Sequence, residues 1–501
     1  MLYWFCASYT TWGMINTMRE IDYLLQIESK YNLPEISLNG FAYWIYFRRN
    51  IMWELIRKKN HYGEAHRQAD VSKKYKIKLR IGMIKNALFC HRADLKDADA
   101  LILNHERRVW NGQYYECIYT DMLADRLGRA VTLERPYQQQ HFAPTPTPCL
   151  IYTDWIEVKA SLFLYMHKYV FKKEYRRVME HISNNIKTAC DELAGLLQIS
   201  CDVQQFAAMI ADGYFVYQVK KKNLDCVLDR FNPKVIIEVV SYNMDCMIVN
   251  ELASRRGIPT IELQHGIADQ EHLAYNYTQG VSVRQFPKYF FAFSDFWCHE
   301  ARFPIAMQNR KAIGFPHLET RAEEFRNFPK DEKRIILFIS QGPIGKELSE
   351  IAVALNELID LRIYRIIYKL HPGEYEEWDK KYERLAASGI EVVDNNKTDL
   401  YQLFAVSSCQ VGGYGSTATL EGMYFELPAY IYENRASGWL LSLCRQKMAW
   451  KFRNAGELWE LIRSNEDKSD VSQKFWKSHA LENMVSEIAN IMNESECGSS
   501  C

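Results

Sequence analysis

The sequence predicts an α/β fold built from two doubly wound, Rossmann-like domains. Short apolar runs alternate with segments of helical spacing over most of the chain, and many of these runs end abruptly in polar or glycine-rich residues. Parallel strands end in this way where their carboxyl ends meet a ligand. The chain has 501 residues, which is too long for one ordinary hydrophobic core and favours at least two domains.

The composition is that of a globular protein without a strong net charge. Hydrophobic residues make up 48% and charged residues 25% of the chain, and 62 basic residues balance 62 acidic ones. A zero net charge gives no argument for nucleic acid as a partner. The 13 cysteines form no CxxC pair, so the sequence predicts neither a zinc site nor a disulfide scaffold. Free thiols of this kind fit a reducing cytoplasm.

Residues 1–90 are expected to form a helical N-terminal extension. Their apolar positions are rich in aromatic residues, and basic residues greatly outnumber acidic ones between positions 41 and 88. The cluster Arg57-Lys58-Lys59 is typical of a helical face that lies in solvent while the helix covers the next domain. Contact of this basic, aromatic segment with an anionic membrane surface is the alternative.

The first Rossmann-like domain is expected at 91–295. Residues 235–240 are a strongly β-branched run, 244–256 have helical spacing, and 258–263 form the next apolar run. Strand, helix and strand at this spacing make a βαβ unit, whose right-handed crossover makes the two strands parallel. The other strands of this domain are expected at 98–104, 130–133, 149–153 and 289–294.

A connector at 296–332 leads to the second Rossmann-like domain at 333–438, which is followed by C-terminal helices and a polar tail at 439–501. The strands of the second domain are expected at 334–340, just before His371, at 390–393, just before Gly412 and at 429–432. Two doubly wound domains leave a central cleft between the carboxyl ends of their sheets. A ligand is expected in that cleft.

A glycine-rich turn with the sequence GGYGST lies at 412–417, directly before a helix. Such a turn presents backbone amides to a ligand, and the dipole of the helix stabilises a phosphate there. The hydroxyl of Ser416 or Thr417 would add a donor. On these residues alone, simple capping of the helix by either hydroxyl explains the pattern equally well. Glu421 lies about one turn further on, where it would accept hydrogen bonds from a ribose or a base.

His371-Pro372 ends another strand of the same domain. The proline forces the chain out of the strand where the histidine must point into the cleft. A histidine there would donate to a phosphate oxygen that gains charge as the leaving group departs. A lone histidine is more often structural, but this one shares its domain with the glycine-rich turn. Lys369 is either a solvated neighbour or a cation that neutralises phosphate.

Together, the segments Ser340-Gln341-Gly342-Pro343, 369–374 and 415–421 resemble the donor-binding half of GT-B glycosyltransferases that build bacterial surface polysaccharides. They are similar to the HP and Ser/Thr motifs of bacterial sialyl-, polysialyl- and Kdo-transferases, and to the CDP-glycerol glycerophosphotransferases of teichoic acid synthesis. In those families the histidine and the Ser/Thr motif contact the nucleotide phosphates, while an acidic residue binds the ribose or the base. The motif-bearing likeness covers about 235–432.

The resemblance implies a donor site in the second domain. Its expected members are Gln341, Lys369, His371, Gly413, Gly415, Ser416, Thr417 and Glu421. The resemblance also implies chemistry without a bound metal or another cofactor. No DxD-like metal motif stands out in the sequence, so amides, helix ends and side-chain cations would stabilise the departing phosphate.

The catalytic base is expected across the cleft. His265-Gly266 ends a strand of the first domain and is similar to the His-Gly of the glycerophosphotransferases, where this histidine is a candidate base. Imidazole titrates near neutral pH, which suits removal of a proton from an acceptor hydroxyl. A structural histidine that fixes the loop is the alternative. The acidic glycine motif of the sialyltransferases has no clean copy here, so Glu106, Glu134 and Asp154 remain open as other bases.

The sequence therefore predicts an inverting, metal-independent GT-B glycosyltransferase with His265 and His371 as catalytic residues. Its substrates would be a nucleotide-sugar donor, CMP-linked or other, and a glycan or lipid-linked acceptor in capsule, lipopolysaccharide or related surface-glycan synthesis. It would act in the cytoplasm, with the inner face of the cytoplasmic membrane as a further location.

Four alternatives remain at this point: a CDP-glycerol-type glycerophosphotransferase, a non-hydrolysing UDP-sugar 2-epimerase, a polysaccharide pyruvyltransferase and a non-catalytic GT-B-like assembly protein. The usual acidic pair of the epimerases is not matched, since only Glu421 follows Thr417 at short range.

Overall fold

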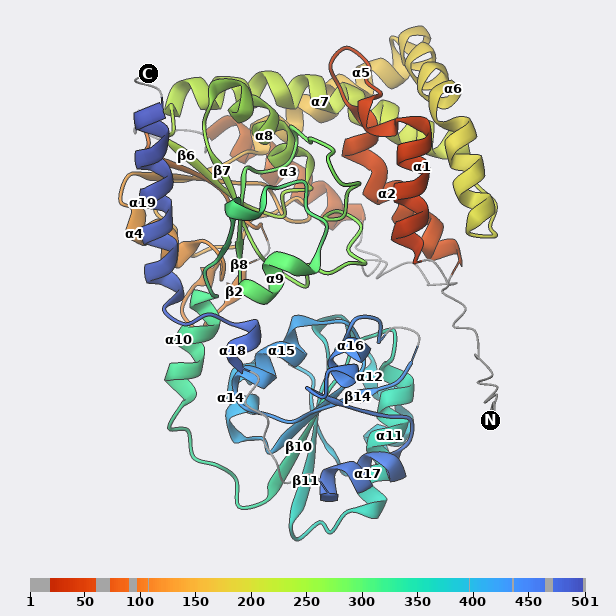
Figure 1. Cartoon of the computed structure of the whole chain (residues 1–501), viewed down its shortest axis with the longest axis vertical. Coiled ribbons are helices and arrows are strands. Elements are labelled where there is room, and N and C mark those ends of the chain that lie inside the picture. The colour runs from red at the N-terminus through yellow and green to blue at the C-terminus, as the bar shows by residue number, and fades with distance from the viewer. Residues whose placement is uncertain are drawn as a thin grey trace, which may run out of the picture.

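The computed structural model describes residues 19–59, 73–89, 97–106, 108–395, 397–434, 437–464 and 472–498. Two α/β domains lie one above the other, and an N-terminal group of helices packs against the first (Figure 1). Each domain contains one fully parallel sheet. The predicted α/β fold with two Rossmann-like domains is therefore confirmed, and this arrangement is the one expected of the GT-B architecture.

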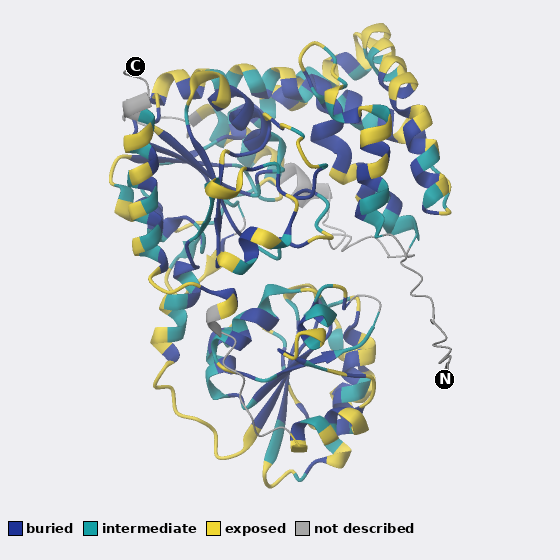
Figure 2. Cartoon of the chain, in the orientation of Figure 1, coloured by how far each residue is buried: buried dark blue, intermediate teal, exposed yellow. Residues whose placement is uncertain are grey.

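The first domain is built on a seven-stranded sheet in the order β5-β4-β1-β6-β7-β8-β9. Its strands are β1 (Ala100–Leu103), β4 (Ala130–Glu134), β5 (Leu150–Tyr152), β6 (Val235–Val239), β7 (Thr260–Leu263), β8 (Tyr289–Ala292) and β9 (Arg310–Ala312). The central strands are buried on both faces because helices cover them (Figure 2), which explains their continuous apolar runs. The chain adds strands on one side of β1 and then, from β6 onward, on the other.

Helices cover both faces of this sheet. The helices of the domain are α4 (Asp121–Leu127), α5 (Asp154–Tyr169), α6 (Lys172–Leu196), α7 (Val203–Phe231), α8 (Met244–Arg256) and α9 (Asp295–Glu300), of which α6 packs against α7 and α1 (Glu20–Tyr31). A small hairpin of β2 (Val109–Trp110) and β3 (Tyr115–Glu116) follows β1. The predicted helix at 244–256 is confirmed to the residue, because Asn243 caps its first turn and Gly257 adopts the left-handed conformation at its end.

The N-terminal helices α1 (Glu20–Tyr31), η1 (Leu33–Glu35), α2 (Tyr43–Lys59) and α3 (Lys73–Phe89) are fixed to the first domain. Glu28 and Arg48 form a fully buried ion pair between α1 and α2, with Nε of Arg48 2.6 Å from the carboxylate. The same guanidinium donates to the carbonyl oxygens of Leu273 (2.8 Å) and Asn276 (2.9 Å). Through Arg48, the extension therefore holds the loop that follows β7.

The aromatic residues of α2 face inward rather than toward a membrane. Trp44, Tyr46 and Phe47 are buried, and in the adjoining basic cluster Arg57 pairs with Glu54. This arrangement fits the prediction of a helical cover for the first domain. The side chains of Lys73 and Lys74, at the start of α3, lie outside the described residues.

The second domain is built on a six-stranded parallel sheet in the order β12-β11-β10-β13-β14-β15. Its strands are β10 (Arg334–Ile339), β11 (Tyr364–Lys369), β12 (Glu391–Val393), β13 (Cys409–Gly412), β14 (Ala429–Tyr432) and β15 (Trp450–Phe452). Its helices are α11 (Gly345–Leu358), η3 (Pro372–Glu374), α12 (Trp378–Lys381), α13 (Glu383–Ala387), α14 (Leu400–Val406), α15 (Thr417–Tyr424), α16 (Leu440–Arg445) and α17 (Ala455–Ser464). Here the direction of strand addition reverses between β10 and β13.

Two of the expected boundaries need correction. The segment 296–332, expected to be a plain connector, contains β9, which pairs in parallel with β8, as well as η2 (Met307–Asn309) and α10 (Pro316–Phe325). The segment 439–501, expected to be helices and a tail, contains β15, the last strand of the second sheet. Both are three-residue edge strands with a basic residue at the centre, so neither shows the apolar run by which buried strands are recognised.

The C-terminal segment returns to the first domain through α18 (Ser472–Phe475) and α19 (Ala480–Gly498). Met484, Ile488 and Ile491 of α19 are buried against the core of the first sheet. The chain thus crosses between the domains twice, which ties them together (Figure 1). Within the described part of the chain, no helix combines the length and apolar character needed to span a membrane.

The Glu28–Arg48 pair gives a first prediction. Replacing one member of a buried ion pair leaves the other charge buried without compensation, which typically costs about 3–5 kcal/mol. We expect Glu28→Gln to lower the free energy of unfolding by this order, measured by urea denaturation. The control is Glu20→Gln, which breaks the half-exposed pair with Lys59, and such pairs contribute about 0–1 kcal/mol. Equal losses in the two variants would contradict an anchoring role for Arg48.

Candidate active site

Both sheets place candidate residues beside the point where strand addition reverses. In the first sheet this point lies between β1 and β6, and in the second between β10 and β13. Ligands of open α/β sheets bind outside the carboxyl ends of the strands at such points. The residues that follow these carboxyl ends are His105, Tyr242 and His265 in the first domain, and Gln341, His371 and the turn 413–417 in the second.

The glycine-rich turn connects β13 to α15. Gly413 has no room for a side chain, because a Cβ there would collide with Tyr432 and Asn434. The Nδ2 of Asn434 donates to the carbonyl of Gly413 (2.9 Å) and fixes the turn from behind. The hydroxyl of Ser416 accepts from the amide of Ala418 (3.3 Å) and caps α15. The helix therefore begins at Thr417 with its first amides at the carboxyl edge of the sheet, where an anion is favoured.

His371 occupies the first position of a tight turn. Its Nδ1 accepts a hydrogen bond from the amide of Gly373 (3.1 Å), and the ring is half-buried. A ring nitrogen that accepts a hydrogen bond carries no proton, so this contact assigns the proton of the neutral imidazole to Nε2. His371 therefore offers an N–H donor at the carboxyl end of β11, beside β10.

Glu374 is a buried carboxylate that the sequence analysis did not single out. Its Oε2 accepts from the backbone amide of His371 (3.0 Å), and its Oε1 accepts from the hydroxyls of Ser340 (3.0 Å) and Tyr382 (2.6 Å). One side chain thus joins the ends of β10 and β11 and orients the histidine turn. Gly345 makes room for it, since a Cβ there would meet Glu374 and Tyr382. A histidine followed three residues later by glutamate is a capping-box spacing, and this signal would have found it.

Lys369 has its contacts inside the second domain. Its Nζ donates to the carbonyls of Leu370 (3.1 Å) and Asn395 (3.3 Å) and to the hydroxyl of Tyr375 (2.5 Å). Burial lowers the pKa of this ammonium to about 8. In this arrangement Lys369 holds the loop after β12, and its part in phosphate binding stays a prediction.

Glu421 lies on α15 and contacts α14. Its Oε2 accepts from the hydroxyl of Tyr401 (2.8 Å). Burial raises the pKa of the Glu421 carboxyl, and hydrogen bonds from Thr417 and Tyr401 oppose that rise. The carboxyl therefore already accepts hydrogen bonds within the domain, and its predicted contact with a nucleotide is untested.

The first domain carries a cavity of about 520 Å³ at the carboxyl ends of β1, β6 and β7. Its lining includes Arg49, His105, Tyr242, Asn243 and His265. The guanidinium of Arg49 lies 4.8 Å from the ring centre of Tyr242. A cation, two imidazoles and a phenol therefore surround one hollow, which suits an anionic or hydroxyl-bearing ligand. A larger hollow of about 1770 Å³ lies around α10 and the 474–482 segment, but none of the predicted site residues lines it.

His265 is held by two phenols. Tyr242 Oη lies 3.1 Å from its Nε2 and Tyr275 Oη lies 3.5 Å from its Nδ1. Burial lowers the pKa of His265 to about 3, and the nearby guanidinium of Arg49 adds to this shift. The imidazole is therefore neutral at physiological pH, which leaves a nitrogen able to accept a proton.

Two buried carboxyls lie behind His265. Glu238 and Glu262 are register partners on β6 and β7. Burial raises the pKa of Glu238 to about 8 and that of Glu262 to about 7. Glu262 Oε1 accepts from Tyr275 Oη (2.6 Å) and lies 3.8 Å from His265 Nδ1. Neighbouring like charges cannot both be kept in the interior, so this pair retains at least one proton near neutrality.

Two tyrosines link the halves of the site. Tyr119 donates to the carbonyl of His265 (3.0 Å), and its ring stacks on Phe315. The ring centre of His317 lies 6.0 Å from that of Phe315 and 5.7 Å from that of Tyr401 on α14. The loop of His265 is therefore connected to the second domain through a series of ring contacts.

The other predicted bases belong to a polar network at the outer strands of the first sheet. His141 joins Glu134 (3.1 Å) and Asp154 (2.7 Å), and Arg108 donates to Glu134 (2.6 Å). Burial alone would lower the pKa of His141, but its hydrogen bonds with the two carboxylates raise it. These carboxylates thus have internal partners, and their role as bases is untested.

Glu106, the third of these alternatives, lies just after β1. Its Oε1 accepts a hydrogen bond from Nη2 of Arg135 (2.7 Å). This ion pair gives the carboxylate a partner at the surface of the first domain, and its role as a base is also untested. Over the described ranges, no group of three or more His, Cys, Asp or Glu side chains is arranged to hold a metal ion.

No known family model matches the chain, and no curated protein matches it. Solved structures do. UDP-GlcNAc 2-epimerase from Methanocaldococcus jannaschii is 11% identical over 78% of this chain and 99% of that chain, with a TM-score of 0.47. UDP-GlcNAc 2-epimerase from Neisseria meningitidis, bound to UDP-GlcNAc, is 11% identical over 79% of this chain and 99% of that chain, with a TM-score of 0.47. The wall teichoic acid polymerase TagF is 10% identical over 84% of this chain and 98% of that chain, with a TM-score of 0.42. Likeness at this level assigns no activity to the chain.

The buried groups predict that stability falls on both sides of neutrality. The carboxyl pKa of Glu238 is raised from 4.5 to about 8, so the contribution of this group to stability is complete below pH 4.5 and is lost as the pH rises from 4.5 to 8. The imidazole pKa of His265 is lowered from 6.5 to about 3, so its contribution is complete above 6.5 and lost as the pH falls toward 3. We expect the thermal midpoint to decrease in both directions.

Two variants test this expectation. Glu238→Gln should flatten the alkaline limb of the thermal-unfolding profile between about pH 6.5 and 8, where this carboxyl is ionised in the unfolded chain but protonated in the folded one. Glu180→Gln, on an exposed position of α6, should leave the profile unchanged. An alkaline limb that keeps its slope in Glu238→Gln would show that this carboxyl is ionised in the folded protein at neutral pH.

Proposed function

We propose that the chain is an inverting GT-B glycosyltransferase that uses a nucleotide-activated donor in surface-glycan synthesis and needs no metal. One observation carries the proposal: histidines follow the carboxyl ends of strands beside the reversal point in both sheets, and a series of ring contacts from Tyr119 to Tyr401 connects the two domains. Two facing groups of this kind suit transfer between a donor on one domain and an acceptor on the other.

The donor would bind the second domain. The first turn of α15 and the turn held by Asn434 would receive the phosphates, and the Nε2–H of His371 would donate to the departing oxygen. Donors already in place where negative charge develops stabilise the transition state without reorganisation. Glu374, by fixing the turn of His371, is a positioning residue in this arrangement.

The acceptor would enter the 520 Å³ cavity of the first domain. His265 would take the proton of the acceptor hydroxyl as its oxygen forms a bond to the anomeric carbon of the donor. The bond between that carbon and the phosphate oxygen breaks, and the nucleotide leaves with the electron pair. The single displacement inverts the configuration of the carbon and requires no covalent intermediate.

The low pKa of His265 would couple proton removal in the first domain to donor binding in the second. In the ligand-free cavity, burial and the guanidinium of Arg49 make the imidazole a weak base. The phosphates of a donor bring negative charge into the cleft, and negative charge near an imidazole raises its pKa. Proton removal would therefore become efficient only when the donor is bound, which limits reaction at other times.

A nucleotide panel tests the donor site. We expect CMP, CDP or UDP to raise the thermal midpoint, since a ligand at 100 times its dissociation constant stabilises a protein by about 2.7 kcal/mol. Ser416→Ala removes the cap of α15, which costs about 0.5–2 kcal/mol, and should also reduce the nucleotide-induced shift. Asp202→Ala removes the equivalent cap of α7 and should lose similar stability while keeping the shift. An unchanged shift in Ser416→Ala would place the nucleotide elsewhere.

Histidine variants test the chemistry. We expect His265→Gln to lower kcat by about 10²–10⁴-fold with the nucleotide shift retained, because general-base catalysis contributes at this scale. His371→Gln should lower both the rate and the shift. His181→Gln, exposed on α6, is the control. Activity should survive EDTA, and loss of activity that Mg²⁺ restores would contradict metal-independent transfer.

The donor that reacts separates the alternatives. CMP-sialic acid and other nucleotide sugars should release nucleotide only when an acceptor is present. Transfer from CDP-glycerol instead would make the protein a glycerophosphotransferase. Interconversion of UDP-N-acetylglucosamine without any acceptor would make it an epimerase, since that reaction needs no second substrate. Phosphoenolpyruvate turnover would expose a pyruvyltransferase. Full tolerance of both histidine variants would favour a non-catalytic assembly protein.

A further inference from the structure

An apolar stripe on α5 faces solvent. Leu162, Tyr165, Met166 and Tyr169 recur at the spacing of one helical face, and each exposes between 38% and 59% of its surface. The opposite face of α5 is buried through Ile156, Ala160 and His167. The exposed stripe is therefore additional to the core-facing one, and apolar patches of this kind mark interaction sites on soluble proteins.

The stripe continues into the corner between α5 and α6. Val170 and Phe171 follow directly, with exposures of 67% and 46%. The ring centres of Tyr165 and Tyr169 lie 4.6 Å apart, so these two side chains of the patch pack against each other. Figure 2 shows the surface of this corner, at the upper right of the first domain, as largely exposed.

Cations surround this apolar corner. Lys172, Lys173, Arg176 and Arg177 lie exposed on the first two turns of α6, and among the described residues none of them makes an ion pair. The one acidic residue between them, Glu174, lies 3.6 Å from His167. The corner thus combines an apolar centre with a positive rim.

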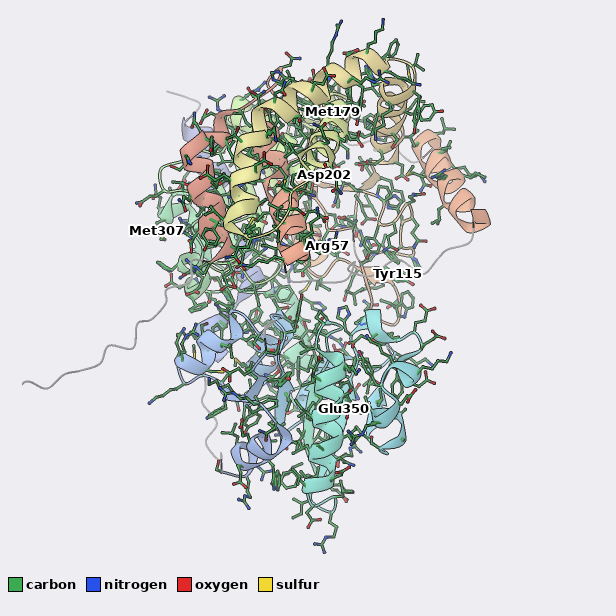
Figure 3. All side chains as sticks on the ribbon, turned by 90° about the vertical axis from the view of Figure 1, so that its right-hand side faces the viewer. Arg57, Tyr115, Met179, Asp202, Met307 and Glu350 are labelled. Atoms are coloured by element: carbon green, nitrogen blue, oxygen red, sulfur yellow. The ribbon has the colours of Figure 1, made fainter. Side chains whose placement is uncertain are left out.

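The neighbouring helix α3 repeats this pattern. Ile81, Ile84 and Leu88 are exposed at helical spacing, with exposed Arg80 and Lys85 beside them. α3 packs along α5, and Nδ2 of Asn86 donates to Asp154 at the start of α5. In Figure 3 the two helices lie side by side at the upper right edge of the molecule.

We propose that the α5–α6 corner, together with α3, docks the protein on the surface of an anionic phospholipid membrane. Helices with apolar and aromatic residues on one face and Lys or Arg at its borders lie in the interface between headgroups and acyl chains. Anionic headgroups attract clusters of lysine and arginine such as those that border this apolar corner. A second copy of the same face is a poor partner, because docking two copies would bring their cations together. This inference goes beyond the proposed function and does not depend on it.

Vesicle binding by the full chain tests the proposal. The probes are vesicles of phosphatidylcholine alone and vesicles that contain about one third phosphatidylglycerol, sedimented at low and high salt. We expect binding to the anionic vesicles, weakening as salt increases. Tyr169→Ser with Phe171→Ser, and separately Lys172→Gln with Lys173→Gln, should each reduce binding at least about tenfold.

The controls separate docking from general surface properties. Leu358→Ser with Leu361→Ser removes two equally exposed leucines from the second domain and should bind vesicles like the wild type. All variants should keep cooperative thermal unfolding, since the replaced side chains are about half exposed or more. Wild-type protein that ignores anionic vesicles would overturn the proposal. A concentration-dependent dimer that the Tyr169/Phe171 variant abolishes, without vesicle binding, would make this face a self-association surface and also overturn it.

Discussion

The structure depends on one constraint of parallel sheets, which is that strands added outward in two directions leave an uncovered crevice where the direction reverses. Each domain has one such point, between β1 and β6 and between β10 and β13. Helices cover the faces of the sheets, so the carboxyl edges there are where loops can meet a ligand without losing core packing. The histidines of both domains follow strands that end at these edges. Their position is a result of topology rather than of local sequence.

Buried or half-buried polar side chains surround His265, and their loss of contact with water is energetically unfavourable. They are Glu238, Glu262, Tyr242 and Tyr275. Among the described residues, Oε2 of Glu238 and Oε2 of Glu262 lack a hydrogen-bond partner. Burial of this kind favours neutral carboxyls and a neutral imidazole. The loop after His265 is held in turn by Arg48, and the next residue of α2, Arg49, lines the cavity beside His265, so the N-terminal helices act on the site both directly and through this loop. Contacts made by the N-terminal helices therefore help to fix the loop that carries His265.

The sequence was sufficient for the strand-end motifs and for the order of the main strands, because buried parallel strands carry continuous apolar runs. It was insufficient for β9 and β15, whose three residues at sheet edges have a basic centre and no apolar run. Glu374 was within reach through its spacing from His371. The ring contacts that connect Tyr119 to Tyr401 and the Glu238–Glu262 pairing were not, because they join elements far apart in the chain and depend on register and packing that no local pattern encodes.

Within the N-terminal extension, α2 and α3 differ in exposure. Trp44, Tyr46 and Phe47 of α2 are buried in the first domain, in line with the expected helical cover. Ile81, Ile84 and Leu88 of α3 are exposed, and the structure adds the α5–α6 corner, which the sequence did not single out. That corner lies on the first domain, at the end of the molecule away from the second (Figure 1). If the proposed docking and the proposed transfer both hold, the domain that would take the acceptor faces the membrane. The donor domain then faces the aqueous phase, where soluble nucleotide sugars reach it without crossing the lipid surface.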